Sequence, residues 1–414
     1  MRRTGIAISS LLLAAIFARA DWPQFLGPRG DAICRQDVSL ARSWPKEGPK
    51  LLWKFPLEEG FANAAVAGDD LYIMDRIGHQ TDVVYHLDLK TGQKKNEFRY
   101  EAGGRMSYPG ARCTPAVDDK HVYTVGPKGD MHALSRKTFK PVWTIHLAKD
   151  FDGKEPFWGY GSSPVLHKDW LLLSPQTGKA GVIAVNRDSG KIAWKSPSLG
   201  DAAHSTPRVV TLDGAEQILM VSRKDLHGLD ANSGESLWTF TGFTCRRPIP
   251  APVKVGDDRL LFIGGYGMGG YSLRVSRGSD GWQVRQLDYN QELTSQTATP
   301  VVHDGHVYFA SNYRRMEHGL VCVTPDGKIK WRTGKSPNFG YGNYAIADGL
   351  MVIVDAEEND LVLVEPTPKG YRELARFENS IKGKTPWGPV VVVDGKLLLR
   401  DQESLRCFDL RAKK

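Results

Sequence analysis

The chain has 414 residues, 41% of them hydrophobic and 25% charged, with a formal net charge of +8 at pH 7. Arg2, Arg3 and Arg19 account for part of that charge, and without them it falls to about +5. Lys and Arg do not gather in blocks, which excludes a nucleic-acid-binding stripe. After residue 20 no stretch reaches the roughly 20 apolar residues of a membrane-spanning helix.

The first twenty residues form a targeting segment. Arg2 and Arg3 precede an apolar run from residue 6 to 17, and Ala18-Arg19-Ala20 matches a cleavage site for secretory signals. The first cysteine is Cys34, too late to serve as the lipid-carrying cysteine of a lipoprotein. We therefore expect a signal peptide over 1–20, an extended segment over 21–48 and a periplasmic or extracellular protein.

From residue 49 onward the chain is an internal repeat. Each unit holds an apolar strand, an Asp-Gly-like turn, a second strand, a turn with Gly, and a strand marked by Trp. Successive units are 43–50 residues apart, enough for four short strands. Their first strands follow Ala65, Pro115, Pro164, Pro207, Pro252, Pro300, Tyr344 and Pro389. Eight such units predict an all-β fold, an eight-bladed β-propeller of four-stranded antiparallel blades.

The two ends of the chain predict how the ring closes. The last unit stops after three strands, and residues 50–58 near the N-terminus supply a matching strand with Trp53. This strand completes the last blade and removes an open edge, so residues 49–414 form one domain. We expect a monomer.

Within the repeat, a turn with Gly precedes the Trp strand. Asp188-Ser189-Gly190 precedes Trp194, and Asp230 opens the same turn before Trp238. The Gly allows a positive φ and the Asp satisfies the turn backbone. The tryptophans are expected to pack between neighbouring blades: Trp143, Trp194, Trp238 and Trp331.

This D-x-x-[TS]-G-x-x-x-W pattern resembles the tryptophan-docking repeat of quinoprotein dehydrogenases, the pyrroloquinoline quinone (PQQ) family. The opening DWPQFLGPRGD and the closing WGPVVVVDGKLLLRDQESLRCFDL also look like secreted PQQ-like propeller proteins. The same repeat occurs in non-enzymatic members such as the outer-membrane assembly factor BamB. The resemblance therefore implies the fold and leaves the activity open.

The loops that enter each innermost strand crowd around one mouth of a propeller channel, the usual ligand site. Arg forks there bind carboxylates and aromatic faces stack on rings or sugars, which suits a small anionic or carbohydrate ligand or a protein partner. The alternative is that these side chains only shape and cap the channel. The candidate mouth residues are Arg105, Tyr108, Arg112, Trp158, Tyr160, His204, Arg246, Arg247, Gln296, Tyr341, Tyr344 and Trp387.

A quinoprotein enzyme requires more than such a mouth. In the resembling enzymes the quinone lies between a Trp and a disulfide of adjacent cysteines, and Glu, Asn and Asp hold a calcium ion. This chain has no adjacent cysteines, and Asp201 is the one acid in its mouth segments. We therefore assign no catalytic residue and no metal site, and the interpretation that follows is a binding or scaffold propeller. The alternatives are a PQQ-dependent alcohol or sugar oxidoreductase and a BamB-like assembly factor.

Two mouth segments carry the same aromatic-Gly-Tyr-Gly signature. FWGYGSSP opens the third unit and NFGYGNYA opens the seventh, four blades away. We therefore expect Tyr160 and Tyr341 to face each other across the channel. The five cysteines lie far apart and their pairing stays open, with Cys322 and Cys407 expected in the core.

Overall fold

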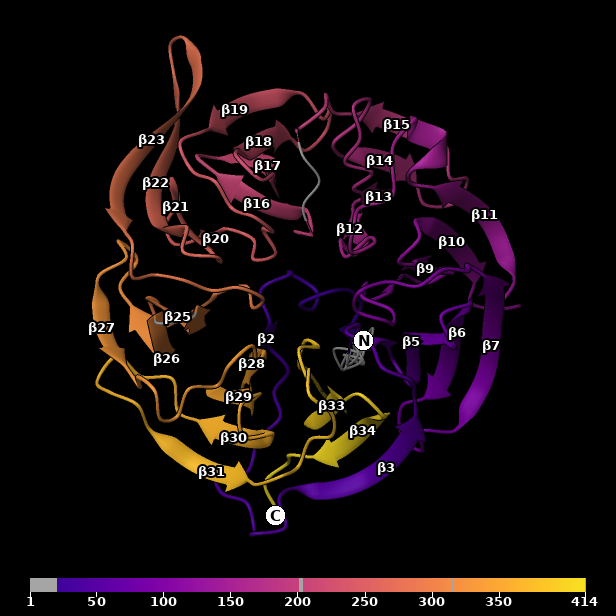
Figure 1. Ribbon diagram of the computed structural model, residues 1–414, viewed down its shortest axis with the longest axis vertical. Coiled ribbons are helices and arrows are strands. Elements are labelled where there is room, and N and C mark those ends of the chain that lie inside the picture. Colours follow the sequence, from indigo (N-terminus) through magenta and orange to yellow (C-terminus); the bar gives the residue numbers. More distant parts are fainter. Residues whose placement is uncertain (1–20, 201–203, 314–315, 414) are drawn as a thin grey trace, which may run out of the picture.

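A computed structural model describes residues 21–200, 204–313 and 316–413, so the expected signal peptide lies outside the described residues. Eight sheets are arranged around a central axis, as Figure 1 shows. Apart from a single 3-10 turn, Lys149–Phe151, the regular structure of these described ranges is β. The prediction of an eight-bladed propeller with four-stranded antiparallel blades is confirmed.

The blades follow one another along the chain, each running from the channel outward. The first blade comprises β4 (Ala65–Ala67), β5 (Asp70–Ile77), β6 (Thr81–Asp88) and β7 (Lys94–Glu101), and the second β8 (Ala116–Val117), β9 (His121–Val125), β10 (Asp130–Ser135) and β11 (Pro141–His146). The third comprises β12 (Val165–His167), β13 (Trp170–Leu173), β14 (Ile183–Asn186) and β15 (Ile192–Lys195). The fourth comprises β16 (Arg208–Leu212), β17 (Ala215–Val221), β18 (Leu226–Asp230) and β19 (Ser236–Phe240).

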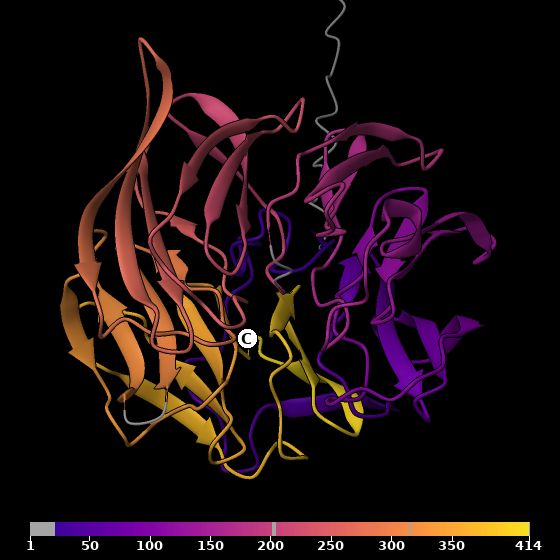
Figure 2. The ribbon, with the colours of Figure 1, turned by 45° about the horizontal axis from the view of Figure 1, so that its top comes forward.

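The next three blades continue the ring, and the fifth ends in a long hairpin that projects beyond the others (Figure 2). The fifth blade comprises β20 (Val253–Lys254), β21 (Arg259–Gly264), β22 (Gly269–Gly278) and β23 (Gly281–Asn290). The sixth comprises β24 (Val301–His303), β25 (His306–Tyr313), β26 (Met316–Val323) and β27 (Ile329–Arg332). The seventh comprises β28 (Tyr344–Ala347), β29 (Leu350–Asp355), β30 (Asp360–Val364) and β31 (Glu373–Phe377).

The last blade contains both ends of the repeat region. Its inner strands are β32 (Val391–Val393), β33 (Lys396–Arg400) and β34 (Ser404–Asp409), and its outer strand is β3 (Lys50–Pro56). β3 pairs with β34 along the strand, with Trp53 opposite Cys407. The predicted closure by the N-terminal strand is confirmed. Because β3 supplies the fourth strand of the last blade, the outer edge of β34 is paired.

The docked tryptophans lock one blade to the next. The indole N–H of Trp53, Trp143 and Trp331 each donates to a backbone carbonyl of the following blade, at 2.8–2.9 Å. The ring of Trp194 packs against Gly234 of the fourth blade, but its indole N–H has no hydrogen-bond partner among the described residues. Trp238 differs, because its indole donates to Gln217 of its own blade at 2.7 Å. The fifth blade has a long hairpin, between β22 and β23, where the first, third and seventh blades carry a turn that accepts the indole N–H.

The turn that receives the indole is organised by one side-chain oxygen. Asp230 Oδ1 accepts from the backbone N–H of Asn232 and Ser233. In the third blade the equivalent acceptor is Asn186, not the expected Asp188. Either an amide or a carboxylate oxygen can cap this turn.

Residues 21–34 lie inside the ring, whereas many of residues 35–48, such as Arg35, Arg42 and Lys46, are exposed. β1 (Asp21–Trp22) runs antiparallel beside β4 of the first blade. The chain then crosses the channel, and β2 (Ile33–Cys34) returns parallel beside β28 of the seventh blade. Figure 1 shows this indigo trace passing through the middle of the ring. We call residues 21–34 the plug.

The core lies between neighbouring sheets, where each blade packs its inner strands against the next. Cys322 and Cys407 are fully buried there, as expected, and all five cysteines are free. Within the described part of the chain, no helix has the length and apolar character needed to cross a membrane.

Candidate functional site

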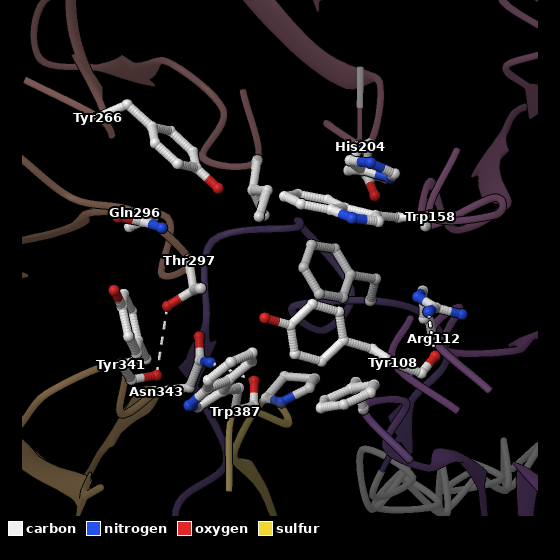
Figure 3. A pocket seen from close by; sticks show the side chains of 16 residues that line it. Tyr108, Arg112, Trp158, His204, Tyr266, Gln296, Thr297, Tyr341, Asn343 and Trp387 are labelled. Carbon is white, nitrogen blue, oxygen red and sulfur yellow. Dashed lines mark hydrogen bonds between the residues drawn. The ribbon is translucent and has the colours of Figure 1, made fainter. Parts of the chain in front are cut away.

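A pocket of about 290 Å³ lies at the channel mouth, on the side where the chain enters the innermost strands. Residues from the entry segments of all eight blades line it, and Phe25 of the plug forms part of its wall. Figure 3 shows the side chains converging on this space. The described lining comprises Phe25, Phe61, Tyr108, Arg112, Trp158, Gly161, His204, Thr206, Ile249, Tyr266, Gln296, Thr297, Tyr341, Asn343, Trp387 and Pro389.

The entry segments are held at one height by hydroxyl groups just before the first strand of a blade. Asn63 N–H donates to Thr114, Thr114 N–H to Ser163, and Ser163 N–H to Thr206, at 3.0–3.3 Å. Ala251 makes the same bond to Thr299. Each link joins one blade to the next, so the Ser/Thr that precedes proline in these segments sets the position of the mouth side chains.

Amide side chains link the entry segments around the closing blade. Asn343 donates to the carbonyl of Trp387 at 2.7 Å, and Asn63 donates to the carbonyl of Pro389 at 2.5 Å. Blades seven, eight and one are therefore tied at the mouth, and Trp387 is fixed between its neighbours.

Aromatic rings form a continuous wall along one side of the pocket. Tyr341 meets Trp387 edge-on with ring centroids 5.1 Å apart, and Trp387 stacks on Phe61 at 5.8 Å. Tyr108 contacts Trp387 at 5.6 Å and Trp158 at 6.1 Å. These distances are typical of favourable ring pairs. The wall offers flat faces and edges to a planar ligand.

Three nitrogen-bearing side chains stand at the end of this wall. Trp158 stacks on His204 with centroids 5.7 Å apart, and the guanidinium of Arg247 lies 4.8 Å from the Trp158 ring. Arg112 donates to the carbonyls of Gly110 and Tyr108 and lies 5.9 Å from the Phe61 ring. Both guanidinium groups therefore face aromatic surface at the mouth.

Burial and mutual repulsion tune these groups. Burial lowers the pKa of Arg112 to about 10, which leaves it charged at neutral pH. Burial, followed by the positive charges of Arg112 and Arg247, lowers the pKa of His204 to about 4, so the imidazole is neutral. No Asp or Glu belongs to the lining described, and no described carboxylate forms an ion pair with Arg112. The described pocket is therefore electropositive.

Seven of the twelve residues expected at the mouth line the pocket: Tyr108, Arg112, Trp158, His204, Gln296, Tyr341 and Trp387. Arg247 reaches it through its contact with Trp158. Arg105 and Arg246 are exposed outside the lining. Whether the lining residues bind a ligand stays a prediction.

Tyr160 and Tyr344 do not lie at the mouth, which corrects the expectation for both. Each side chain is 3% exposed. The Tyr160 hydroxyl donates to Pro175 O at 3.4 Å, and that of Tyr344 donates to Thr299 O at 3.0 Å. Both rings fill space beneath the mouth, because an apolar ring behind the entry segment is better buried than exposed.

The expected pair of Tyr160 and Tyr341 across the channel is therefore wrong. The two aromatic-Gly-Tyr-Gly segments do reach one pocket, through Gly161 and Tyr341. Figure 3 shows Trp158 and Tyr341 on opposite sides of that pocket. In the third blade, the aromatic residue before the glycine, Trp158, lines the pocket, whereas the tyrosine after it does not.

Sequence reasoning missed several lining residues for different reasons. Phe61 lies in the entry segment of the first blade and shares its position with the other candidates, so the repeat alone could have found it. Tyr266 lies in the Gly-rich turn between β21 and β22, which sequence reasoning placed within a hairpin. Phe25 belongs to the plug, and no local signal in the sequence places the plug inside the channel.

The described residues do not fit a calcium-bound quinone of the quinoprotein type. Cys113 and Cys245 are buried under entry segments of different blades and are not adjacent. No cluster of three His, Cys, Asp or Glu side chains suited to a metal ion occurs in the described parts of the chain. Asp201, the one acid of the mouth segments, lies outside the described residues. We therefore derive no catalytic step through a quinone.

Eight four-stranded blades, interblade tryptophans and a mouth built from every entry segment define a tryptophan-docked β-propeller. The chain belongs to the PQQ-like propeller family. A family model described as outer membrane protein assembly factor BamB matches residues 102–241 and 158–368.

Solved structures share the fold at low sequence identity. BamB from Moraxella catarrhalis aligns with a TM-score of 0.61 at 13% identity, covering 87% of this chain and 99% of the other. Quinohemoprotein alcohol dehydrogenase from Comamonas testosteroni aligns with a TM-score of 0.68 at 13% identity, covering 97% and 82%. At this identity the similarity establishes the fold and not the activity.

One curated relative matches in sequence over a limited region. Lupanine 17-hydroxylase [cytochrome c] from a Pseudomonas species is 28% identical over 138 residues. The match covers 30% of this chain and a fifth, 20%, of the relative's length.

Proposed function

We propose that the protein is an exported binding propeller that holds a small, flat, anionic ligand in the mouth pocket. The observation that carries the proposal is the pocket itself, which is lined by aromatic faces and the guanidinium of Arg112 without a described carboxylate, with the guanidinium of Arg247 against the Trp158 ring. Arg binds carboxylates through paired N–H donors, and a flat ring buries area against Trp158 and Trp387. Export rests on the N-terminal twenty residues of the sequence.

A matched pair of probes tests this proposal. Naphthalene-2,6-dicarboxylate and the neutral naphthalene-2,6-dimethanol have the same ring and differ in charge. We expect the dicarboxylate to quench tryptophan fluorescence saturably and the dimethanol to bind at least tenfold more weakly. Equal affinity for the two probes contradicts an anion site, and binding of neither contradicts a ligand pocket.

A PQQ-dependent oxidoreductase is a second candidate. It is favoured by the sequence match to a hydroxylase and by the aromatic pocket, and PQQ is itself a flat polycarboxylate. Its test is titration with PQQ, with and without Ca²⁺, followed by dye-linked alcohol oxidation. Binding with turnover supports the oxidoreductase, whereas binding without turnover supports the binding propeller.

A scaffold in outer-membrane protein assembly is a third candidate, favoured by the family model that matches the chain. Affinity capture from the envelope fraction of the host tests it. Recovery of assembly-machinery proteins, retained after the mouth variant Trp158→Ala, supports a scaffold role on another surface.

A further inference from the structure

We propose that the plug and the third and fourth blades form a second, inner site for a small oxyanion, with Arg208 as its fixed cation. The space is a cavity of about 460 Å³, separate from the mouth pocket, with Phe25 and Thr206 lining both. The inference does not depend on the function proposed for the mouth. We call this cavity the inner chamber.

The plug and the innermost strands of two blades build the walls of the inner chamber. Gln24 accepts the backbone N–H of Leu166 at 2.7 Å, which ties the plug to β12. Arg208, the first residue of β16, donates to Gly30 O at 2.5 Å, which ties the plug to β16. The exposed residues Pro28 and Arg29 line the outer part of the chamber, so solutes reach it from solvent.

The charges of the inner chamber are out of balance. Arg208 donates one N–H to a neutral carbonyl, that of Gly30, and burial lowers its pKa. Asp31, whose charge acts on Arg208, forms an ion pair with Arg35 at 2.6 Å. Glu216, the acid of the lining, is held by Lys168 at 2.6 Å. In the described parts of the chain, no carboxylate lies within ion-pair distance of Arg208 or Arg29.

A buried polar group supplies the second observation. His167 is 8% exposed and lines the inner chamber, and its Nε2 has no hydrogen-bond partner among the described residues. Buried polar atoms and charges are costly when unpaired. An oxyanion bound by the free N–H groups of Arg208 and by His167 satisfies both groups at once. Carboxylate and phosphate share the geometry that a guanidinium fork recognises.

Calorimetric titration of the full chain with succinate and, separately, with inorganic phosphate tests the proposal. Titration with chloride at the same ionic strength is the control. We expect saturable binding of at least one oxyanion. Arg208→Gln should weaken it at least tenfold, while Arg285→Gln, an exposed arginine on β23, should leave it unchanged. The preference between succinate and phosphate identifies the class of oxyanion.

Two further variants keep the test decisive. If Arg208→Gln fails to fold, Arg29→Gln at the exposed rim should still weaken binding about threefold. Trp158→Ala alters the mouth alone, so the oxyanion affinity should persist in it even if mouth binding is lost. Absence of binding by both oxyanions, or unchanged affinity in the Arg208 and Arg29 variants, overturns the proposal.

Discussion

Arg112 shows how a single residue acquires its role from its surroundings. Its guanidinium is fixed by the carbonyls of Gly110 and Tyr108 and lies beside the Phe61 ring. No described carboxylate neutralises it, so its charge is available to the pocket. Arg105, seven residues earlier in the same entry segment, is exposed and lies outside the lining.

Replacing Arg112 should therefore weaken anion binding selectively. Arg112→Gln should weaken binding of naphthalene-2,6-dicarboxylate by about 10- to 100-fold, because a hydrogen bond to a charged group contributes roughly 1.5–3 kcal/mol. Tryptophan fluorescence titration measures the change. The control Arg105→Gln should change the affinity less than twofold. Equal losses in the two variants would indicate a diffuse effect of net charge instead of a positioned guanidinium.

His204 gives a prediction about pH. Its pKa is about 4 in the folded protein because of burial and of the neighbouring Arg112 and Arg247, and about 6.5 in the unfolded chain. Between these values the unfolded chain binds the proton and the folded protein does not. The free energy of unfolding therefore falls as pH is lowered from about 6.5 to 4, and the full contribution of His204 is present above pH 6.5.

Urea denaturation at several pH values checks this dependence. Other buried histidines contribute similarly, so the difference between the wild type and His204→Gln isolates His204. The variant should lose less stability than the wild type between pH 6.5 and 4. Identical pH slopes in both proteins would show that His204 is not the group responsible.

At the scale of an element, the turn that receives an indole joins two blades through one close approach. Gly190 has φ of +69°, and a Cβ there would lie 2.6 Å from the Trp143 ring. Asn186 caps the same turn, and the Trp143 indole donates to Arg187 O at 2.9 Å. The glycine is thus needed both for its backbone conformation and for the space it leaves.

A pair of glycine substitutions separates these two requirements. Gly214 also has a positive φ, +78°, but a Cβ there meets nothing within 4 Å. Gly214→Ala should cost about 1–2 kcal/mol from the backbone alone. Gly190→Ala should cost about 1–3 kcal/mol more, because it also crowds the indole. Chemical denaturation measures both, and equal losses would contradict the tight docking of Trp143.

At the scale of the whole molecule, ring closure depends on contacts between residues more than 300 positions apart. Arg400 of the last blade forms an ion pair with Asp75 of the first at 2.9 Å, and both side chains are almost fully buried. Arg400 also donates to Met74 O and Glu58 O. Asp75 in turn accepts the backbone N–H of Glu58, just after the closing strand. One buried pair therefore ties both ends of the repeat region.

Breaking this pair should destabilise the ring strongly. Arg400→Met should lower the free energy of unfolding by about 3–5 kcal/mol, because it leaves the carboxylate of Asp75 buried without its partner. The double variant Arg400→Met/Asp75→Leu should recover part of the loss. Thermal and chemical denaturation measure both, and additive losses would show that the two residues act independently.

The repeat and the closure were readable from the sequence because they depend on local patterns. Alternating apolar runs, Asp-Gly turns and the spacing of tryptophans specify strands and hairpins, and the missing fourth strand of the last unit identifies Trp53 as its replacement. The position of the mouth residues followed from the same repeat, which is why Trp158, Tyr341 and Trp387 were found.

The tertiary structure alone decided which way individual side chains turn and where the plug lies. Tyr160 differs from Trp158 by two positions, yet one is buried beneath the mouth and the other lines it, since each side chain follows the packing available to it. Phe25 and Arg208 meet at the inner chamber only because the plug crosses the channel. A contact across a channel leaves no periodic signal in the sequence. A strand that buries one face, in contrast, has an apolar residue at every second position, because successive side chains point to opposite faces.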